Sequence, residues 1–474
     1  MRSKLQKFSQ FAESLLPHEV AYLLSIENFE DAERLQILRR IDGFVRKMNP
    51  GHSYDEAIDK RKYSHLKNWI ETRLEGIDVD VQFEWMSDME REIMTDSIQP
   101  SGEKRLLKAL KQYTPSSFYF TRFYDLLKMY RHFLLIRMRY NDHALVEAYL
   151  QENQEDYDRN VQILEKLHEA TGDIVHHYSG RKSESHQWER WLNSVFYDEA
   201  LDGSIRYMAF IRLAFMQFNY GNVDALVEPL NYLDEAFQDG QYYSGRILAN
   251  YYNTRLMLHS RFGEYQKAMF YGYLSIRNKT HDYILYVNNL CAVLLRLGKN
   301  EEALELMKVA SPEMKNTKNY HNKIGFVAFY MESLIKNDLF KNAENYGNTY
   351  LKAFENEILQ HRWHLFFSVY FEALLHRNDF TKIFRLARKY KLVERDKAYE
   401  NKANYLPTIP CLLEIAKYQS GSIREKELKQ FLQTRLELMP TASTDRYVRL
   451  LSGINPILKK LGLGELKMDA KMNI

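Results

Sequence analysis

The sequence predicts an all-α fold, an α–α superhelix built from antiparallel helix pairs. Its 474 residues include 10 Pro and 19 Gly but 34 Tyr and 26 Phe. Helix-breaking residues are therefore scarce, while large side chains that pack between helices are plentiful. Apolar residues recur at three-to-four-residue spacing along most of the chain, which is typical of amphipathic helices. A short glycine-to-alanine pattern also repeats after residue 245, as expected of stacked helix pairs.

The first predicted region, residues 1–100, is an N-terminal helical region. Two amphipathic helices are expected within 2–47 and another over 54–75. Residues 77–83 alternate between apolar and polar side chains like a short strand. Apolar residues nevertheless recur at helical spacing from about Asp80 onward, so we predict a helix there.

The second predicted region, residues 103–236, contains long helices that pair as hairpins. Two of its helix junctions are similar in sequence, residues 140–147 and residues 220–228. This similarity favours degenerate repeats, and a set of unrelated hairpins is the alternative.

The third predicted region, residues 245–405, carries the clearest repeat. Gly263 precedes Ala268 by five residues, and Gly298 precedes Ala303 by the same spacing, with 35 residues between the two copies. Glycine permits the sharp turn between two helices, and the small alanine lets the helices approach closely. We therefore expect each copy to be a helix pair.

Two later copies continue the pattern at a spacing of 40 residues, with Asn in the place of Gly, an exchange that turns tolerate. With these turns the chain resembles the tetratricopeptide repeat family, in which Gly-Asp-Tyr-x-x-Ala joins the paired helices. The resemblance covers residues 247–277, 282–310, 320–354 and 361–391. The chain departs from the family at Gly272, at or beside a usual aromatic, and in its longer later units. The resemblance implies a solenoid of stacked hairpins.

The last predicted region, residues 406–474, is a C-terminal helical cap. Helices are expected near 409–419, 423–438 and 444–461. The ends of a solenoid need a polar outer face, which distinguishes such a cap from another repeat. From about Gly464 onward the tail is expected to be frayed.

The charge balance, the apolar stretches and the cysteines of the sequence disfavour several classes of function. With 66 basic and 63 acidic residues the net charge is +3, so no global field favours nucleic acid or an anionic membrane. No apolar stretch approaches 18 residues, so no membrane span is predicted. Cys291 and Cys411 lie within apolar helical patterns, which favours buried thiols in a reducing compartment. The N-terminus lacks the apolar core of a secretory signal, and we predict a cytoplasmic protein.

No known catalytic motif occurs in the sequence. There is no Gly-rich phosphate loop, no Gly-x-Ser-x-Gly and no His-Glu-x-x-His, so neither an enzyme nor a cofactor is predicted. His361 and His364 lie one helical turn apart and could share a metal ion. No third ligand accompanies them at a telling distance in the sequence, so no metal site is predicted.

A basic and aromatic segment over residues 104–139 raises nucleic-acid binding as a minor alternative. Interleaved rings could stack on bases while the cations contact phosphates. The structural interpretation is that the rings are core and the charges form a solvated rim, some of them facing the acidic stretch 78–92. The cations are Lys104, Arg105, Lys108, Lys111, Arg122, Lys128, Arg131, Arg137 and Arg139.

Repeat register predicts a ligand groove on the first helix of each pair. The tetratricopeptide resemblance implies that such positions line a concave groove that holds extended peptides or C-terminal carboxylates. Asn can hydrogen-bond a peptide backbone in both directions, and Arg can grip a carboxylate with two donors. Counting back ten and two residues from the turn gives Asn253, Asn288, Arg261, Arg296 and Lys336, with His376 in the fourth unit.

A structural interpretation applies to the basic members of this set, since a cation in the last turn of a helix complements the helix dipole without any ligand. The leading functional hypothesis is a non-enzymatic scaffold that binds a protein or peptide partner in the groove. The alternative is a ligand- or peptide-responsive regulator whose residues 1–100 act on a target.

Overall fold

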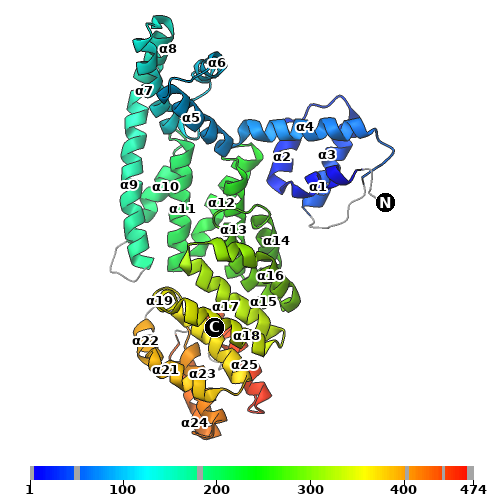
Figure 1. Ribbon diagram of the computed structural model, residues 1–474, viewed down its shortest axis with the longest axis vertical. Coiled ribbons are helices and arrows are strands. Elements are labelled where there is room, and N and C mark those ends of the chain that lie inside the picture. The colour runs from blue at the N-terminus through cyan, green and yellow to red at the C-terminus, as the bar shows by residue number, and fades with distance from the viewer. Residues whose placement is uncertain (1–4, 47–53, 179–184, 401–404, 440–443, 467–474) are drawn as a thin grey trace. The chain divides into compact units, whose positions relative to one another are not determined.

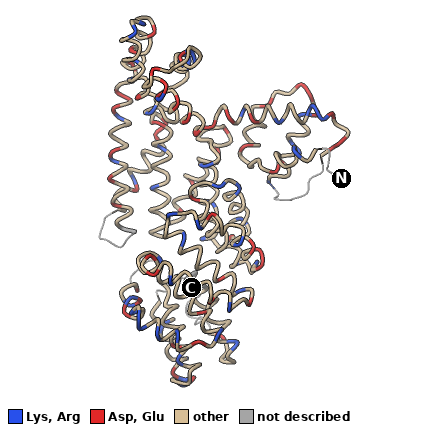
Figure 2. The backbone as a smooth tube through the Cα atoms, viewed as in Figure 1, with Lys and Arg blue, Asp and Glu red and all other residues tan. Residues whose placement is uncertain are grey.

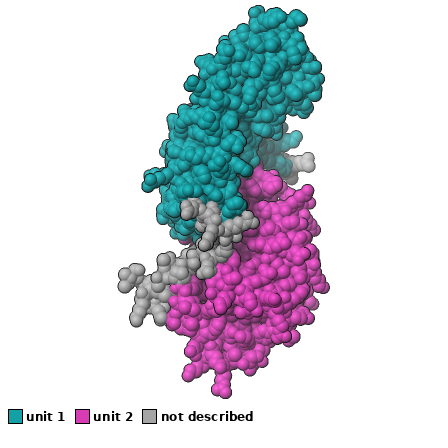
Figure 3. Space-filling model, turned by 90° about the vertical axis from the view of Figure 1, so that its left-hand side faces the viewer, with its two compact units in different colours: residues 1–262 teal, residues 263–474 magenta. Residues whose placement is uncertain are grey.

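The protein is all-α in a computed structural model, which describes residues 5–46, 54–178, 185–400, 405–439 and 444–466 (Figure 1). No strand occurs in these ranges. The chain forms two compact units, residues 1–262 and residues 263–474, coloured separately in Figure 3. The finer division into four regions stays a prediction. Within the described ranges, no helix has both the length and the apolar character needed to cross a membrane.

Unit 1 begins with a bundle of short helices and the longer α4 and α5. Asp31, Asp59 and Asp78 cap the first turns of three of them, because each carboxylate accepts a hydrogen bond from a backbone N–H of that turn. The helix predicted from about Asp80 is confirmed as α5. These helices are α1 Gln6–Ser14, α2 Pro17–Ile26, α3 Ala32–Val45, α4 Lys60–Ile77 and α5 Val79–Met94.

The remainder of unit 1 consists of longer helices. Tyr140 begins α8 whereas Tyr220 ends α11, so the two similar junctions do not occupy equivalent positions. The expected correspondence between them is therefore wrong in register. The helices are α6 Pro100–Ala109, α7 Phe120–Ile136, α8 Tyr140–Glu152, α9 Gln154–Tyr178, η1 Ser185–Trp188, α10 Glu189–Tyr197, α11 Gly203–Tyr220, η2 Val223–Leu226, α12 Val227–Gln238 and α13 Gly245–Arg261.

A buried carboxylate organises the centre of unit 1. Asp202 is 0% exposed and lies at the start of α11, where it accepts a hydrogen bond from the Ser204 N–H at 2.8 Å. The same carboxylate accepts hydrogen bonds from the N–H groups of Tyr119 and Thr121 at 3.1 and 2.9 Å. One side chain thus satisfies the otherwise unpaired first donors of both α7 and α11.

The N-terminal bundle is anchored to the rest of unit 1 by a polar network beneath α2. The imidazole of His18 lies 2.7 Å from the Tyr252 hydroxyl through Nδ1 and 2.8 Å from Asp234 Oδ1 through Nε2. The Tyr243 hydroxyl donates to Glu19 at 2.7 Å. Because buried polar groups are costly when unpaired, these bonds define where α2 lies on α12 and α13.

Unit 2 continues with paired helices and ends in a three-helix segment. The predicted C-terminal helices are confirmed as α23 to α25. Residues 467–474, most of the tail expected to be frayed, lie outside the described ranges. The helices are α14 Tyr265–Ser275, α15 Tyr283–Arg296, α16 Asn300–Asn316, α17 Tyr320–Lys336, α18 Phe340–Ala353, α19 Glu355–Gln360, α20 Trp363–His376, α21 Phe380–Lys389, α22 Leu392–Tyr399, α23 Thr408–Gln419, α24 Glu425–Glu437 and α25 Thr444–Lys460.

The turns that follow α13, α15, α17 and α20 have a left-handed residue at a repeating position. Gly263, Gly298, Asp338 and Asn378 have φ values of 74°, 70°, 59° and 57°. The repeat phase is therefore confirmed, but in the third copy Asp338 takes the position where Asn337 was expected to replace Gly. The left-handed region favours Gly and tolerates Asn or Asp, which explains the residue types found at these turns.

The small residues expected at helix contacts are buried. Ala268 and Ala303 are both 0% exposed, as predicted. Gly347 in α18 is tighter still, since a Cβ added there would lie 2.6 Å from a ring carbon of Tyr370 and 2.8 Å from the sulfur of Met331. Glycine at this position therefore allows α18 to pack closely against α17 and α20.

We predict that Gly347→Ala lowers the free energy of unfolding of unit 2 by about 1–3 kcal/mol, because the added methyl overpacks a closed core. Chemical denaturation measures the change. Gly453→Ala is the matched control. Gly453 also lies inside a helix, but apart from its chain neighbours and the backbone of its own helix nothing lies within 4 Å of an added Cβ. It should be neutral or stabilising by up to about 1 kcal/mol. Equal effects of both substitutions would contradict this account of α18 packing.

We also predict that acid loosens the anchor of the N-terminal bundle. Burial raises the pKa of Asp234, but hydrogen bonds from His18 and Tyr251 outweigh it and lower the pKa to about 2. A carboxyl with a depressed pKa stabilises the fold above its ordinary pKa of 3.8, and this stability is lost as pH falls toward 2. Thermal melts between pH 5 and pH 2 should show a smaller loss in Asp234→Asn than in the exposed control Asp224→Asn. Identical pH profiles would contradict the prediction.

Candidate ligand-binding surface

Three first helices of unit 2 pack side by side, with α17 between α15 and α20. Ionisable side chains near the ends of these helices form what we call the first-helix surface, which consists of Arg296, Glu332, Lys336, Glu372 and His376. Arg296 is exposed and the other four are half-buried. The predicted residues Arg296 and Lys336 therefore lie in the same unit and on neighbouring helices.

Lys336 is paired across helices rather than free. Its Nζ lies 3.5 Å from Glu372 Oε1 on α20, and the side chains are 28% and 15% exposed. The charge of Glu372 is the main cause that raises the pKa of Lys336. The positive charge predicted for the groove is thus partly neutralised by carboxylates that were not among the predicted residues.

Glu332 is the most perturbed carboxyl on this surface. Burial, followed by repulsion from Glu372, raises its pKa to about 7, although Lys336 and Arg296 lower it. The side chain nevertheless keeps partial contact with solvent. A carboxyl that is both surrounded by protein and reachable by water lies in a recess where charge is costly.

The sequence did hold a signal for the two glutamates. Glu332 precedes Lys336 by four residues, and Glu372 precedes His376 by four residues in the next unit, 40 residues later. Side chains four residues apart share a helix face. Counting back six residues from the left-handed turn residues Asp338 and Asn378, in addition to two and ten, would have found both glutamates.

His376 is not a cation at neutral pH. Its ring stacks on Phe340 with centroids 4.3 Å apart, and Lys460 Nζ lies 3.4 Å from Nδ1. Burial and then the charges of Lys460 and Lys336 lower the pKa of His376 to about 4.

Asn288 corrects one part of the predicted groove. It is 1% exposed, and its Nδ2 donates a hydrogen bond to the backbone oxygen of Asn322 on α17 at 3.0 Å. Asn253 in unit 1 is also buried, with 4% exposure. The expectation that these two amides are exposed is wrong, because the position ten residues before the turn faces neighbouring structure. Arg261 is exposed at the end of α13, also in unit 1.

An arginine covers the opposite end of α17. A Cβ added at Gly325 would lie 2.3 Å from a guanidinium nitrogen of Arg362, so glycine here lets that cation lie against the helix. Burial and then the charge of Arg362 lower the pKa of His321 to about 4. Cations therefore lie near both ends of α17, Arg362 at one end and Lys336 with Arg296 at the other.

The basic segment 104–139 fits its structural interpretation. Phe120, Phe123, Tyr124 and Tyr130 are buried, so these rings are not stacking platforms. Five of the nine cations proposed for nucleic acid pair with carboxylates of unit 1: Arg122 with Glu90, Lys128 with Asp125 at 3.1 Å, Arg131 with Glu147 at 3.1 Å, Arg137 with Asp96 at 2.6 Å, and Arg139 with Glu103 and Asp142. Of these carboxylates only Glu90 belongs to the acidic stretch 78–92.

Other candidate groups are structural. Cys291 and Cys411 are buried as predicted, and burial raises the pKa of each thiol to about 12. His361 stacks on Tyr320, whereas His364 Nε2 lies 3.3 Å from Asp396 Oδ1. In the described ranges no group of three or more His, Cys, Asp or Glu residues could hold a metal ion.

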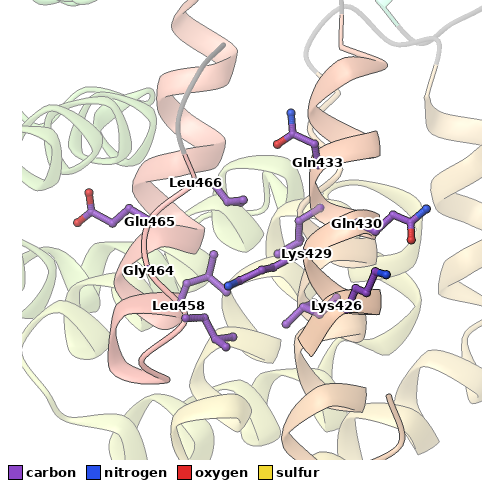
Figure 4. Close-up of a pocket in the computed structure, with 11 residues that line it drawn as sticks. Lys426, Lys429, Gln430, Gln433, Leu458, Gly464, Glu465 and Leu466 are labelled. Carbon is purple, nitrogen blue, oxygen red and sulfur yellow. The ribbon is translucent and has the colours of Figure 1, made fainter. Parts of the chain in front are cut away.

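A cavity of about 800 Å³ lies between α24 and residues 458–466 (Figure 4). Leucines from both segments line it, with Lys426, Lys429, Gln430 and Gln433 along α24. Lys429 is itself paired with Glu425 at 2.5 Å. Most of the polar groups lie along α24, and Glu465 lies on the opposite segment. Within the described residues no ion pair joins the two sides, so the first-helix surface is the stronger candidate.

We predict that Glu332 makes unit 2 less stable as pH rises. A carboxyl whose pKa is raised from 4.5 to about 7 stabilises the fold below pH 4.5, and this contribution is lost as pH rises toward 7. Denaturation between pH 4 and pH 8 should show a smaller loss in Glu332→Gln than in Glu305→Gln. Glu305 lies on the outer helix α16 with a 67% exposed side chain. If the free energy of unfolding changes with pH in the same way in both variants, the raised pKa of Glu332 is contradicted.

No protein-family model matches the chain, and neither the curated proteins nor the solved structures include a match. The tetratricopeptide resemblance accordingly rests on the turn residues and on the helix pairs of unit 2.

Proposed function

We propose that the protein is a non-enzymatic, tetratricopeptide-like scaffold that binds a protein or peptide segment on the first-helix surface of unit 2. The observation that carries the proposal is the alignment of three neighbouring first helices, whose polar residues recur in repeat register. An extended peptide has backbone and side-chain groups that also recur along its length, so a repeated surface can follow it. The two buried free thiols suit a reducing compartment such as the cytoplasm.

The charges favour an acidic segment as the ligand. Arg362 and Arg296 lie toward opposite ends of α17, with Lys336 near Arg296. Burial is the main cause of the lowered pKa values of His321 and His376, and positive neighbours at each end lower these pKa values further. Because the pKa of Glu332 is about 7, this carboxyl is ionised in only a fraction of the molecules near pH 7. A ligand carboxylate close to these cations would gain charge-assisted hydrogen bonds.

A regulator is the second candidate function. The His18 network joins the N-terminal bundle to α12 and α13, so the bundle has a defined docking position from which it could be released. In this version residues 1–100 act on a target after release.

We predict that reversing two charges, Arg296→Glu with Lys336→Glu, weakens binding of acidic peptides at least tenfold. Each lost charge-assisted bond is worth about 1.5–3 kcal/mol. Fluorescence polarisation with acidic, neutral and basic decapeptides measures the effect. Lys308→Glu with Lys341→Glu is the control, since these exposed cations lie on the second helices α16 and α18. The proposal fails if no acidic peptide binds, or if both double variants bind alike while their melts stay unchanged.

A further inference from the structure

The ion pair between Lys336 of α17 and Glu372 of α20 is a loose contact. Lys336 Nζ lies 3.5 Å from Glu372 Oε1, at the upper limit of a hydrogen bond. Bonds between an ammonium and a carboxylate are usually about 2.7–2.9 Å long, and Lys382 reaches Glu344 at 2.9 Å in the same unit. Within the described ranges Lys336 forms no other hydrogen bond. Since an ammonium has three N–H donors, Lys336 can accept a closer partner.

A second carboxylate opposes the contact between Glu372 and Lys336. After burial, repulsion from Glu372 is the next cause that raises the pKa of Glu332. Attraction to Glu372 is the main cause that raises the pKa of Lys336, and Glu332 raises it as well. The two carboxylates thus act on the same ammonium, and like charges that share a site repel each other. Repulsion from Glu332 therefore weakens the hold of Lys336 on Glu372.

The charges of the first-helix surface nearly cancel. Arg296 and Lys336 are its cations, and Glu332 and Glu372 are its carboxylates. His376, whose pKa is about 4, is uncharged at neutral pH. Basic and acidic residues are also mixed along the other helices of unit 2 (Figure 2). An acidic ligand therefore meets a carboxylate wherever it meets a cation, and its affinity depends on whether that carboxylate moves away.

We propose that Glu372 is an internal competitor of the acidic ligand on the first-helix surface. In the free protein its carboxylate occupies Lys336, and an acidic segment binds by displacing it from that ammonium. The inference rests on the proposed function, because it concerns the same surface and the same class of ligand. It adds the residue that limits the affinity of this surface.

The exchange of carboxylates also makes the surface selective. A ligand carboxylate that reaches Lys336 at the usual length of about 2.7–2.9 Å replaces a weak bond with a stronger one. A neutral segment cannot make this exchange, and its binding would leave the Lys336 and Glu372 pair in place. Glu372 therefore disfavours ligands that lack an acidic group, as a repulsive or unmatched element does in selective interfaces generally.

Fluorescence polarisation with the full chain and the acidic decapeptide tests the proposal. Glu372→Gln keeps the shape of the side chain without its charge, and should bind about three- to fivefold more tightly than the wild type, because a partly exposed ion pair no longer has to be broken. Glu344→Gln is the matched control. Glu344 is a half-buried carboxylate that pairs with Lys382 in the same unit, but it lies on the second helix α18. Its loss changes the net charge equally and should leave the affinity unchanged.

A second variant separates displacement from a general effect of charge. Glu372→Asp keeps the charge but is one carbon shorter, so it should release Lys336 and also bind the acidic peptide more tightly than the wild type. Wild-type affinity in Glu372→Asp, no gain in Glu372→Gln, or an equal gain for the neutral decapeptide would overturn the inference while the proposed function stands. If neither the wild type nor Glu372→Gln binds an acidic peptide, the proposed function fails and the inference fails with it.

Discussion

Close approach between helices is the constraint on which unit 2 depends. Gly347, Ala303 and Gly325 leave no side chain, or a single methyl, where neighbouring helices or side chains meet the backbone. Gly347 lets α18 pack closely against α17 and α20, and α17 itself packs against α15 and α20. The charged residues in the last turns of these first helices therefore lie close together. The pairing of Lys336 with Glu372 is a consequence of this spacing, as is the raised pKa of Glu332.

Local sequence was sufficient to predict the helices and most of the repeat register. The turn residues Gly263 and Gly298 have the left-handed backbone that their chemistry suggested, and Ala268 is buried as expected. These features depend on a few neighbouring residues, so a sequence pattern can reveal them. The shift from Asn337 to Asp338 shows the limit, since both residue types tolerate the same turn.

Features that depend on which helices become neighbours could not be predicted in the same way. Asn288 is in the predicted helix, but its burial follows from the position of α17, whose backbone oxygen it contacts. The bond between His18 and Asp234 joins residues 216 positions apart in the sequence. No local sequence pattern predicts a contact between residues so far apart. The glutamates of the first-helix surface are an intermediate case. Their spacing was visible in the sequence, but the contact of Glu372 with Lys336 on a neighbouring helix was not.

A carboxyl that titrates near neutrality also affects the energetics of any ligand that lies beside it. An anion close to Glu332 raises the pKa of this side chain further, so that binding draws a proton from solution, and a cation there releases one. The heat of association measured by calorimetry would then include the ionisation enthalpy of the buffer. Comparison of phosphate with Tris buffer at one pH would count those protons and give the sign of the ligand's charge.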